Sequence, residues 1–237
     1  MKRRDGGVAA RLEALTAQWS LDPRVAAQLT QLLTMLRDDP RAATSVREPA
    51  EAVDVHVADS LTALPWLNDV HRLADVGSGA GFPGLAIAIA RPGLYIDLVE
   101  SVSRKCEFMR DAVAALALEH VRVVDSRAED WARGDGGERY EAVLARAVAP
   151  LATLAEYAAP LLAAGGRLIA WKGARDAGEE EAAARAAAQL GLAPAGVERT
   201  HPYPGSRAHT LHLYEKVRPT PAGFPRRTGA ARKRPLA

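Results

Sequence analysis

The residues of this chain that most clearly indicate a chemical function are a group of glycines that follow one aspartate. Residues 75–84 read DVGSGAGFPG, with an apolar segment before them and a helical one after. Glycine permits a tight turn and lets a ligand approach the backbone, because no Cβ stands in the way. Free N–H groups at the start of the next helix favour polar or anionic ligand groups. The segment predicts a ligand site between a strand and a helix.

Two cofactors fit this turn. The spacing of Gly79, Gly81 and Gly84 matches the dinucleotide fingerprint, which is weak by itself. Asp75, however, stands two residues before the first glycine, where a carboxylate could meet the ammonium of S-adenosyl-L-methionine. Glu100 ends the next apolar segment, and a carboxylate there can hold the ribose hydroxyls of either cofactor. We therefore favour S-adenosyl-L-methionine over NAD, and a glycine turn kept only for packing is the remaining alternative.

Two later segments could complete the cofactor site. Residues 126–130 follow the third expected strand, at the edge where open α/β sheets bind ligands. Their backbone, at Ala128 and Glu129, could meet the adenine, although a charged loop that caps the next helix is the better interpretation of these residues taken alone. Arg146 follows the fourth expected strand and would face the transferred methyl group. An ordinary surface arginine or a contact to a substrate phosphate is the alternative there.

Several chemistries lack their residues in this chain. No Asn-Pro-Pro or Asp-Pro-Pro motif for methylation of exocyclic amines occurs, and no phosphate loop or zinc motif. Cys106, the sole cysteine, falls within an expected helix, far from where a pyrimidine C5 nucleophile would be needed. The six histidines have no ligand spacing, so we expect no metal. A site without a general base suits a nucleophile that needs no deprotonation, such as guanine N7, with catalysis by orientation and proximity.

The elements that must position these residues alternate between short apolar runs and helical stretches. This alternation predicts a mostly parallel sheet with helices on both faces, and the last strand, which follows a loop, is expected to pair antiparallel at the edge. We divide the chain into a helical appendage (1–70), an S-adenosylmethionine-binding core (71–217) and a basic tail (218–237). The strands are expected at 73–76, 94–99, 121–124, 142–145, 167–171 and 209–216, and the main helices at 8–19, 25–36, 49–63, 85–90, 105–118, 150–163 and 178–190.

Charge is distributed unevenly along the chain. Seven basic and no acidic residues lie from Lys216 onward, which leaves 24 basic against 29 acidic residues in the rest. A second, smaller basic cluster lies at residues 2–4. An acidic body with basic ends indicates an anionic partner such as nucleic acid, although a solvated tail is the plainer alternative. Residues 218–237, rich in Pro, Gly and Arg, are expected to order only against a partner.

Composition places the chain among ordinary globular proteins. It has 237 residues, of which 48% are hydrophobic and 25% charged. No apolar run approaches the roughly 20 residues of a membrane span, and the charged start leads into no signal-peptide core. We expect a cytoplasmic protein with no membrane partner.

The chain resembles the bacterial 16S rRNA guanine-N7 methyltransferase family, also called the glucose-inhibited division protein B family. The resemblance covers roughly residues 44–216 and the tail. Its most specific part is the glycine turn together with the upstream motif HVADSL at 56–61. The other matching segments are TSVR at 44–47, SRAE at 126–129, ARA at 145–147, WKG at 171–173 and FPRRTG at 224–229.

The resemblance implies a Rossmann-like class I methyltransferase fold and N7 methylation of one guanine in 16S rRNA, either naked or within the small ribosomal subunit. The residues it assigns to the cofactor are Gly77, Gly79 within the same turn, Phe82, the backbone of Ala128 and Glu129, and Arg146. Those it places on the RNA side are His56, Asp59, Lys172, Arg207, Arg226 and Arg227. Glu100 is added on physical grounds, and no catalytic base is assigned. For His56, a structural hydrogen bond that joins the helical part to the sheet is at least as good an interpretation.

One position departs from the family pattern. The family has an Asn-Leu-Thr where this chain has Ala42-Ala-Thr44, so the Asn contact is missing and Ala42 receives no role. Two other functions stay open: a methyltransferase for a small molecule or protein, and a non-catalytic nucleotide-binding module. Removal of residues 218–237 is expected to abolish rRNA methylation and to leave S-adenosylmethionine affinity intact.

Overall fold

The computed structural model describes the backbone of residues 2–42, 44–207 and 209–236, and side chains within these ranges from residue 7 on. The side chains of the basic cluster 2–4 therefore lie outside the described part. The strands are β1 (Arg72–Val76), β2 (Tyr95–Glu100), β3 (Val121–Asp125), β4 (Tyr140–Arg146), β5 (Leu162–Lys172), β6 (Leu192–Thr200) and β7 (His209–Lys216). The helices are α1 (Lys2–Gln18), α2 (Arg24–Asp38), α3 (Pro49–Ala52), η1 (Val53–Ala58), α4 (Asp59–Leu61), η2 (Leu64–Leu67), α5 (Gly84–Ala90), α6 (Ser103–Ala115), α7 (Ala128–Arg133), α8 (Leu151–Ala158), α9 (Ala177–Leu190) and α10 (Ala230–Lys233).

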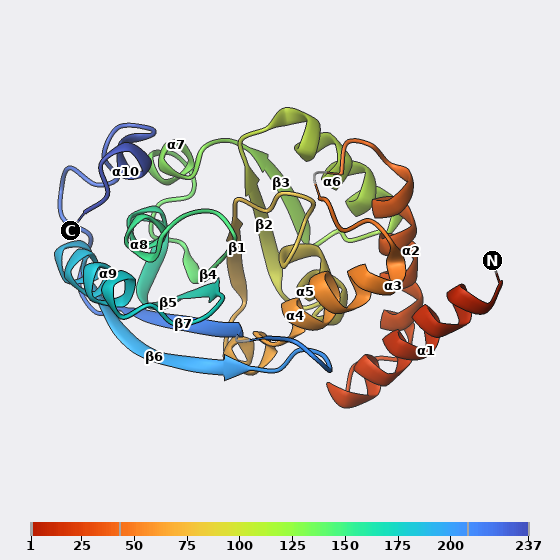
Figure 1. Cartoon of the computed structure of the whole chain (residues 1–237). Helices are drawn as coiled ribbons and strands as arrows, with labels where there is room; N and C mark the ends of the chain where they lie inside the picture. The colour runs from red at the N-terminus through yellow and green to blue at the C-terminus, as the bar shows by residue number, and fades with distance from the viewer. Residues whose placement is uncertain (1, 43, 208, 237) are drawn as a thin grey trace.

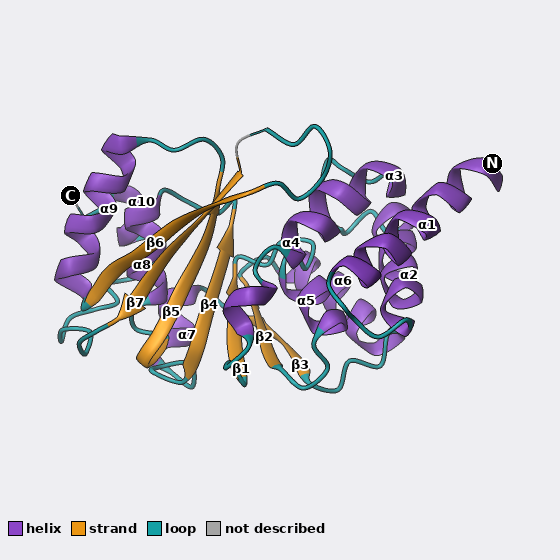
Figure 2. Ribbon diagram, turned by 90° about the horizontal axis from the view of Figure 1, so that it is seen from below, coloured by secondary structure: helices purple, strands orange, loops and turns teal. Residues whose placement is uncertain are grey.

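These strands form one sheet in the order β3-β2-β1-β4-β5-β7-β6. The strands β1 to β5 run parallel, and β7 pairs antiparallel with both β5 and β6. Figure 1 shows the sheet as the centre of the molecule, and Figure 2 shows α1 to α6 on one side of it and α8, α9 and α10 on the other. The expected α/β fold with helices on both faces is confirmed.

Alternating strand residues supply the two cores of the molecule. On β1, Leu73 belongs to the cluster under α1 to α6, and Ala74 to the cluster under α7 to α9. On β4, Leu144 and Ala145 divide in the same way, as the pleat of a strand requires. The first cluster is continuous from Val8 in α1 to the sheet. The N-terminal helices therefore share a core with the sheet, where the sequence suggested a separate appendage.

The third expected helix, over 49–63, is less regular than its sequence implied. It runs through α3, η1 and α4, and η1 is a six-residue π-helix in its middle. A π turn has wider spacing than an α turn, and such turns are frequent at functional sites. His56 lies within this π-helix and Asp59 directly follows it, and both residues belong to the upstream motif at 56–61.

The end of the sheet formed by β7 and β6 differs from one expectation. The last strand, β7, is antiparallel as expected, but it lies inside the sheet because β6 covers its outer edge. The sequence of β6 lacks strict alternation and contains Pro194 and Gly196, which obscured it. A proline is tolerated at a sheet edge, and the pairing with β7 shifts register between these two residues.

The basic tail corrects a second expectation, that it orders only against a partner. Residues 218–236 fold back over the α7, α8 and α9 side of the sheet and contain α10. The side chains of Phe224 and Leu236 pack against the second core cluster, and Ala231 is buried. The segment folds back because apolar residues stand among its arginines and can be buried against the core. A count of charges alone does not reveal these residues.

The described part of the chain contains no helix long and apolar enough to cross a membrane. Within the same part, no three His, Cys, Asp or Glu side chains are grouped so that they could hold a metal ion.

Candidate active site

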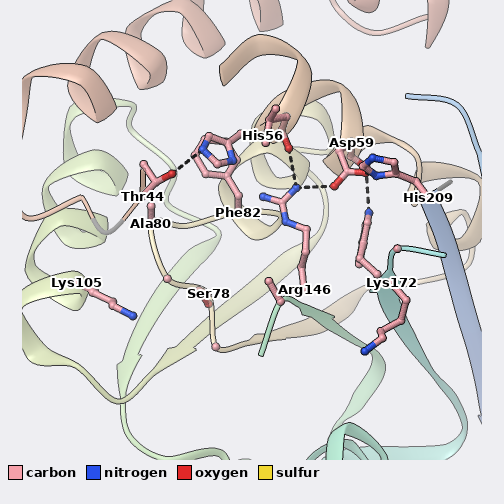
Figure 3. A pocket seen from close by; sticks show the side chains of 16 residues that line it. Thr44, His56, Asp59, Ser78, Ala80, Phe82, Lys105, Arg146, Lys172 and His209 are labelled. Atoms are coloured by element: carbon pink, nitrogen blue, oxygen red, sulfur yellow. Dashed lines mark hydrogen bonds and ion pairs between the residues drawn. The ribbon is translucent and has the colours of Figure 1, made fainter. Parts of the chain in front are cut away.

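A cleft of about 580 Å³ opens at the carboxyl ends of β1, β4 and β5 (Figure 3). The sheet order reverses between β1 and β4, and open α/β sheets bind ligands at such a switch point. The residues that line the cleft are Thr44, Val55, His56, Asp59, Gly77, Ser78, Gly79, Ala80, Phe82, Lys105, Arg146, Ala147, Trp171, Lys172, Gly173 and His209. Seven of the residues expected at the site from sequence are therefore brought together here.

The glycine turn has two kinds of glycine. A Cβ on Gly81 would stand 2.3 Å from Leu85, and one on Gly84 would stand 2.3 Å from Leu98, so these two positions are small for packing. Gly79 differs, because a Cβ there would meet nothing closer than 3.8 Å, yet the residue has a φ of +60° and lines the cleft. Packing alone does not account for this glycine. An opening at backbone level fits a ligand that lies against the turn.

Asp75 does not reach into the cleft. Its side chain is fully buried beneath the turn, where Oδ2 accepts a hydrogen bond from the Gly84 amide at 2.9 Å. Its Oδ1 has no partner in the described structure. Burial raises the pKa of Asp75 to about 7, although the Gly84 hydrogen bond opposes this. The carboxylate expected to meet an ammonium group therefore fastens the glycine turn to α5.

Glu100 lies under the turn from the other side. Its Oε2 accepts from the Gly79 amide at 3.1 Å, and its Oε1 accepts from the amides of Ser101 and Val102. Lys105 pairs with it at 3.6 Å. Glu100 is buried beside the cleft without lining it, so a ribose contact requires the carboxylate to exchange some of these partners and remains a prediction.

Ala128 and Glu129 do not line the cleft; they begin α7 after β3. The Glu129 side chain is buried and accepts from the Gly229 amide in the tail at 2.8 Å. Residues 128–130 of the expected charged loop thus form the first half of the short helix α7. Its place at the carboxyl edge, next to β2, is where the adenine was expected, and that assignment also remains a prediction.

His56 and Phe82 form one wall of the cleft. Their rings are stacked, with centroids 4.8 Å apart and planes 17° apart. The His56 Nε2 lies 3.0 Å from the Thr44 hydroxyl and 3.2 Å from the Val46 carbonyl, and Nδ1 is buried without a partner. Burial, together with the charge of Arg146, lowers the pKa of His56 to about 4. These hydrogen bonds join His56 to the segment between α2 and α3, where the structural alternative had a bond to the sheet, and the ring faces the cleft.

Asp59 organises the opposite wall. Its Oδ2 accepts from Arg146 Nη1 at 2.8 Å and its Oδ1 from His209 Nδ1 at 3.1 Å, while Trp171 Nε1 donates to its carbonyl. Asp59 is 4% exposed. A carboxylate this buried, with both oxygens occupied, holds other side chains in place. The structure shows Asp59 in such a positioning role, and its expected RNA contact stays a prediction.

The remaining basic residues divide by location. Lys172 lines the cleft and pairs with Glu179 of α9 at 2.7 Å. Arg207 and Arg227 are exposed outside the cleft. Arg226 forms a two-bond ion pair with Glu156 of α8, whose side chain is fully buried. The structure thus gives Arg226 a protein partner where the sequence suggested RNA.

Ala42, at the position of the missing Asn, is buried and lies outside the cleft. Its carbonyl accepts from Arg47 Nη2 at 2.7 Å. Arg47 also donates to the carbonyl of Asp39 at 3.0 Å. These bonds fix the connection between α2 and α3, which carries Thr44 to the cleft.

Sequence reasoning missed His209 and Lys105. His209 reaches Asp59 across 150 positions, and Tyr203 packs edge-on against its ring at 5.9 Å. No spacing rule links residues so far apart, so only the fold brings them together. Lys105 lies in the first turn of α6, and its closeness to the end of β2 was the one available signal.

Comparison with known proteins gives the same family from two directions. A family described as rRNA small subunit methyltransferase G matches residues 26–203. The ribosomal RNA small subunit methyltransferase G of Roseiflexus castenholzii is 47% identical over 195 residues, which cover 81% of this chain and 83% of the relative. The enzyme of the same name from Deinococcus deserti is 40% identical over 215 residues, with 88% of both chains covered.

Two solved structures of low sequence identity share this architecture. A geranyl diphosphate methyltransferase in complex with geranyl diphosphate and sinefungin superposes with a TM-score of 0.59 at 17% identity, covering 88% of this chain and all of the other. A second structure of geranyl diphosphate methyltransferase, in complex with S-adenosylmethionine, gives 0.56 at 17% identity over 78% and 95% of the chains. These likenesses support the fold.

Proposed function

The chain belongs to the rRNA small subunit methyltransferase G family, and we propose that it transfers a methyl group from S-adenosyl-L-methionine to N7 of one guanine in 16S rRNA. Methylation of small subunit rRNA with this cofactor follows from the family. The guanine, its N7 atom and the form of the substrate, naked rRNA or assembled subunit, are the proposed part.

The observation that carries the N7 assignment is the chemistry of the cleft walls. A pKa of about 4 makes His56 too weak a base to deprotonate an amine or hydroxyl near neutral pH. Asp59 is occupied by Arg146 and His209, and the other charged lining residues are the cations Lys105 and Lys172. Guanine N7 carries an exposed lone pair, so its methylation needs no base.

The residues present fit the cofactor. The turn at Gly77 to Phe82 leaves backbone open toward the cleft at Gly79, and the stacked Phe82 and His56 rings offer an apolar wall. S-adenosyl-L-methionine supplies a methyl group on a sulfonium: the N7 lone pair forms the new C–N bond, and the electron pair of the broken S–C bond stays on sulfur. No proton is released in this step.

The chain contributes orientation and charge balance. Arg146 is 14% exposed at its side chain and is held by Asp59 at the switch point, between the turn and the opening of the cleft. Lys172 and Lys105 stand at its two sides and suit the phosphates of an RNA strand. Positioning of this kind accounts for a large part of many rate enhancements.

A second candidate chemistry rests on the Asp59–His209 pair. A histidine whose Nδ1 donates to a carboxylate can act as a general base, which would suit an oxygen or an exocyclic amine. That reaction would make His209 essential. Under the N7 proposal the same ring only contacts the base or its sugar.

The experiment is to map the methylated atom. Small subunit rRNA from cells lacking this protein is treated with the purified enzyme and S-adenosyl-L-methionine, then reduced with borohydride and cleaved with aniline, which act at N7-methylguanine. We expect one new cleavage site with the wild type and none with Gly79→Asp. Methyl transfer that leaves no cleavable site would refute the N7 assignment.

His209→Ala separates the two chemistries further. We expect its kcat to fall by less than about tenfold, because an orienting contact is lost, with an unchanged pH profile. A fall of about a thousandfold together with loss of one pH inflection would favour general-base chemistry.

A further inference from the structure

The C-terminal segment, defined here as residues 218–236, is anchored first to α8. The Arg226 guanidinium donates to both oxygens of Glu156, at 2.8 and 2.5 Å, and the Glu156 side chain is fully buried. Thr153 Oγ1 donates to the Ala231 carbonyl at 3.3 Å. A buried carboxylate with one cationic partner makes that contact costly to lose, so this end of the segment is firmly held.

From this anchor the segment reaches α7. The Gly229 amide donates to Glu129 Oε1 at 2.8 Å, and the Thr228 hydroxyl donates to Asp130 Oδ1 at 2.5 Å. Arg133 Nη2 donates to the Arg226 carbonyl at 2.6 Å and to the Pro225 carbonyl at 3.3 Å. Figure 1 shows α10 beside α7 and α8. Side chains from both the start and the end of α7 are bonded to the C-terminal segment.

The helix α7 needs outside support. It has six residues, and so short a helix is not stable by itself. One support is internal: Trp131 donates to the Tyr140 hydroxyl at 2.7 Å, and Tyr140 donates to Asp97. That network holds only the middle of α7. The first-turn carboxylates, Glu129 and Asp130, receive their described long-range bonds from the C-terminal segment.

We propose that the C-terminal segment braces the adenine end of the cofactor site by holding α7 in place, so that its loss weakens S-adenosylmethionine binding. The inference rests on the proposed function, since it takes Ala128 and Glu129 as the residues next to adenine. It reverses the expectation that removal of the tail leaves cofactor affinity intact. The physical reason is that one face of the C-terminal segment forms hydrogen bonds with α7 and α8 of the same chain.

The outer face of the same segment is a different surface. Arg227, Arg232, Lys233 and Arg234 are exposed on it. Exposed cationic side chains of this kind suit RNA phosphates. Variants can therefore test the two faces separately.

The first test uses Arg133→Ala, which removes the bonds to the carbonyls of Pro225 and Arg226. Its side chain is 40% exposed, so the chain should still fold. We expect the Kd and KM for S-adenosylmethionine to rise about tenfold, with kcat at saturating cofactor unchanged. Amide exchange of residues 126–133 should quicken in the cofactor-free protein. Arg133→Lys, which can reach one carbonyl, should recover part of the affinity.

Arg185→Ala is the matched control, because Arg185 makes a comparable exposed ion pair on α9, with Glu181 at 2.8 Å. It should change neither quantity. Unchanged cofactor affinity and unchanged exchange in Arg133→Ala would overturn the brace. If the wild type itself failed to bind S-adenosylmethionine, the proposed function would fall instead.

The second test compares truncation after residue 217 with an outer-face variant that carries Gln at 227, 232, 233 and 234. The truncated chain should bind S-adenosylmethionine at least tenfold more weakly, and the outer-face variant should bind it normally while methylating rRNA poorly. A folded truncated chain with wild-type cofactor affinity contradicts the brace. Should truncation prevent folding, the Arg133→Ala result decides.

Discussion

The structure differs most from the sequence-based expectation at two buried ionisable side chains, Asp59 and Asp75. Each was read from sequence as facing a ligand, and each instead holds a part of the site in place. Asp75 lies near the end of β1 and Asp59 at the start of α4, and each carboxylate could point toward a ligand or toward protein groups around it. Asp59 is 4% exposed and Asp75 is 0% exposed, so both carboxylates bond to protein groups.

The pair formed by Arg146 and Asp59 gives the first prediction. Arg146→Ala leaves a buried, uncompensated carboxylate, which should cost about 3–5 kcal/mol of unfolding free energy. Arg146→Lys keeps the charge and should fold, but it loses the rigid guanidinium and should lower methyl transfer by about tenfold to a hundredfold. Denaturant titration and a methylation assay measure the two effects. Arg24→Ala, which breaks an exposed pair with Asp22, is the control and should do neither.

The pKa of Asp75 gives a pH prediction. Because the folded-state pKa of about 7 lies above the ordinary 3.8, Asp75 contributes stability that is full below pH 4 and lost as the pH rises through 7. Asp75→Asn cannot ionise, so the fall in unfolding free energy between pH 5 and 8 should shrink by about 1–4 kcal/mol. Urea titrations of both proteins at the two pH values measure it. Equal pH slopes would show that Asp75 ionises normally.

At the scale of elements, the π-helix η1 decides what the N-terminal half offers to the cleft. Its wider turn lets His56 stack on Phe82 while Asp59 reaches Arg146. Both contacts come from one helix, yet they serve different walls. The backbone of the glycine turn has its own hydrogen bonds to β2 and Asp75, and its contact with η1 is the stacking of Phe82 on His56.

Deletion of Val55 tests this. Without one residue the π turn cannot form, and the segments before and after it cannot both keep their packing. We expect methyl transfer to fall at least a hundredfold, because His56 and Asp59 can no longer both keep their places in the walls of the cleft. Val55→Ala keeps the length and should behave as the wild type. Retained methylation in the deletion variant would show that η1 is not needed for activity.

At the scale of the whole molecule, the N-terminal helices and the sheet share one hydrophobic core. The leucines of α2, which are fully buried at Leu29, Leu32 and Leu33, belong to the same cluster as Leu85 and Leu98. Removing them would expose an apolar surface that covers one face of the sheet. A separable appendage would have had a core of its own.

A fragment of residues 41–237 therefore should not fold. We expect it to aggregate or to lack a cooperative thermal transition, because several large side chains, each worth about 1.5–3 kcal/mol when buried, lose their cover. Expression yield, near-UV circular dichroism and calorimetry check this. A chain that starts at Gly7 keeps Val8 and the later described core residues and should fold normally. A soluble, cooperative 41–237 fragment would restore the division into domains.

Sequence alone determined the class of the fold and the centre of the site. Strands alternating with helices can be read locally, because period and turn residues are properties of neighbours in the chain. The glycine turn could be read for the same reason, and so could the basic composition of the tail. Strand β6 was the exception, since an edge strand has little apolar alternation to reveal it.

Tertiary structure alone decided the direction and partners of the polar side chains. Asp59 meets His209 across 150 positions and Arg226 meets Glu156 across 70, and no local pattern encodes either pair. The same holds for the tail, whose charge was visible in the sequence while its contacts with α7 and α8 were not. The sequence shows how many charged residues the chain has, but not which of them are buried. A buried charge needs a partner, and only the fold brings that partner to it.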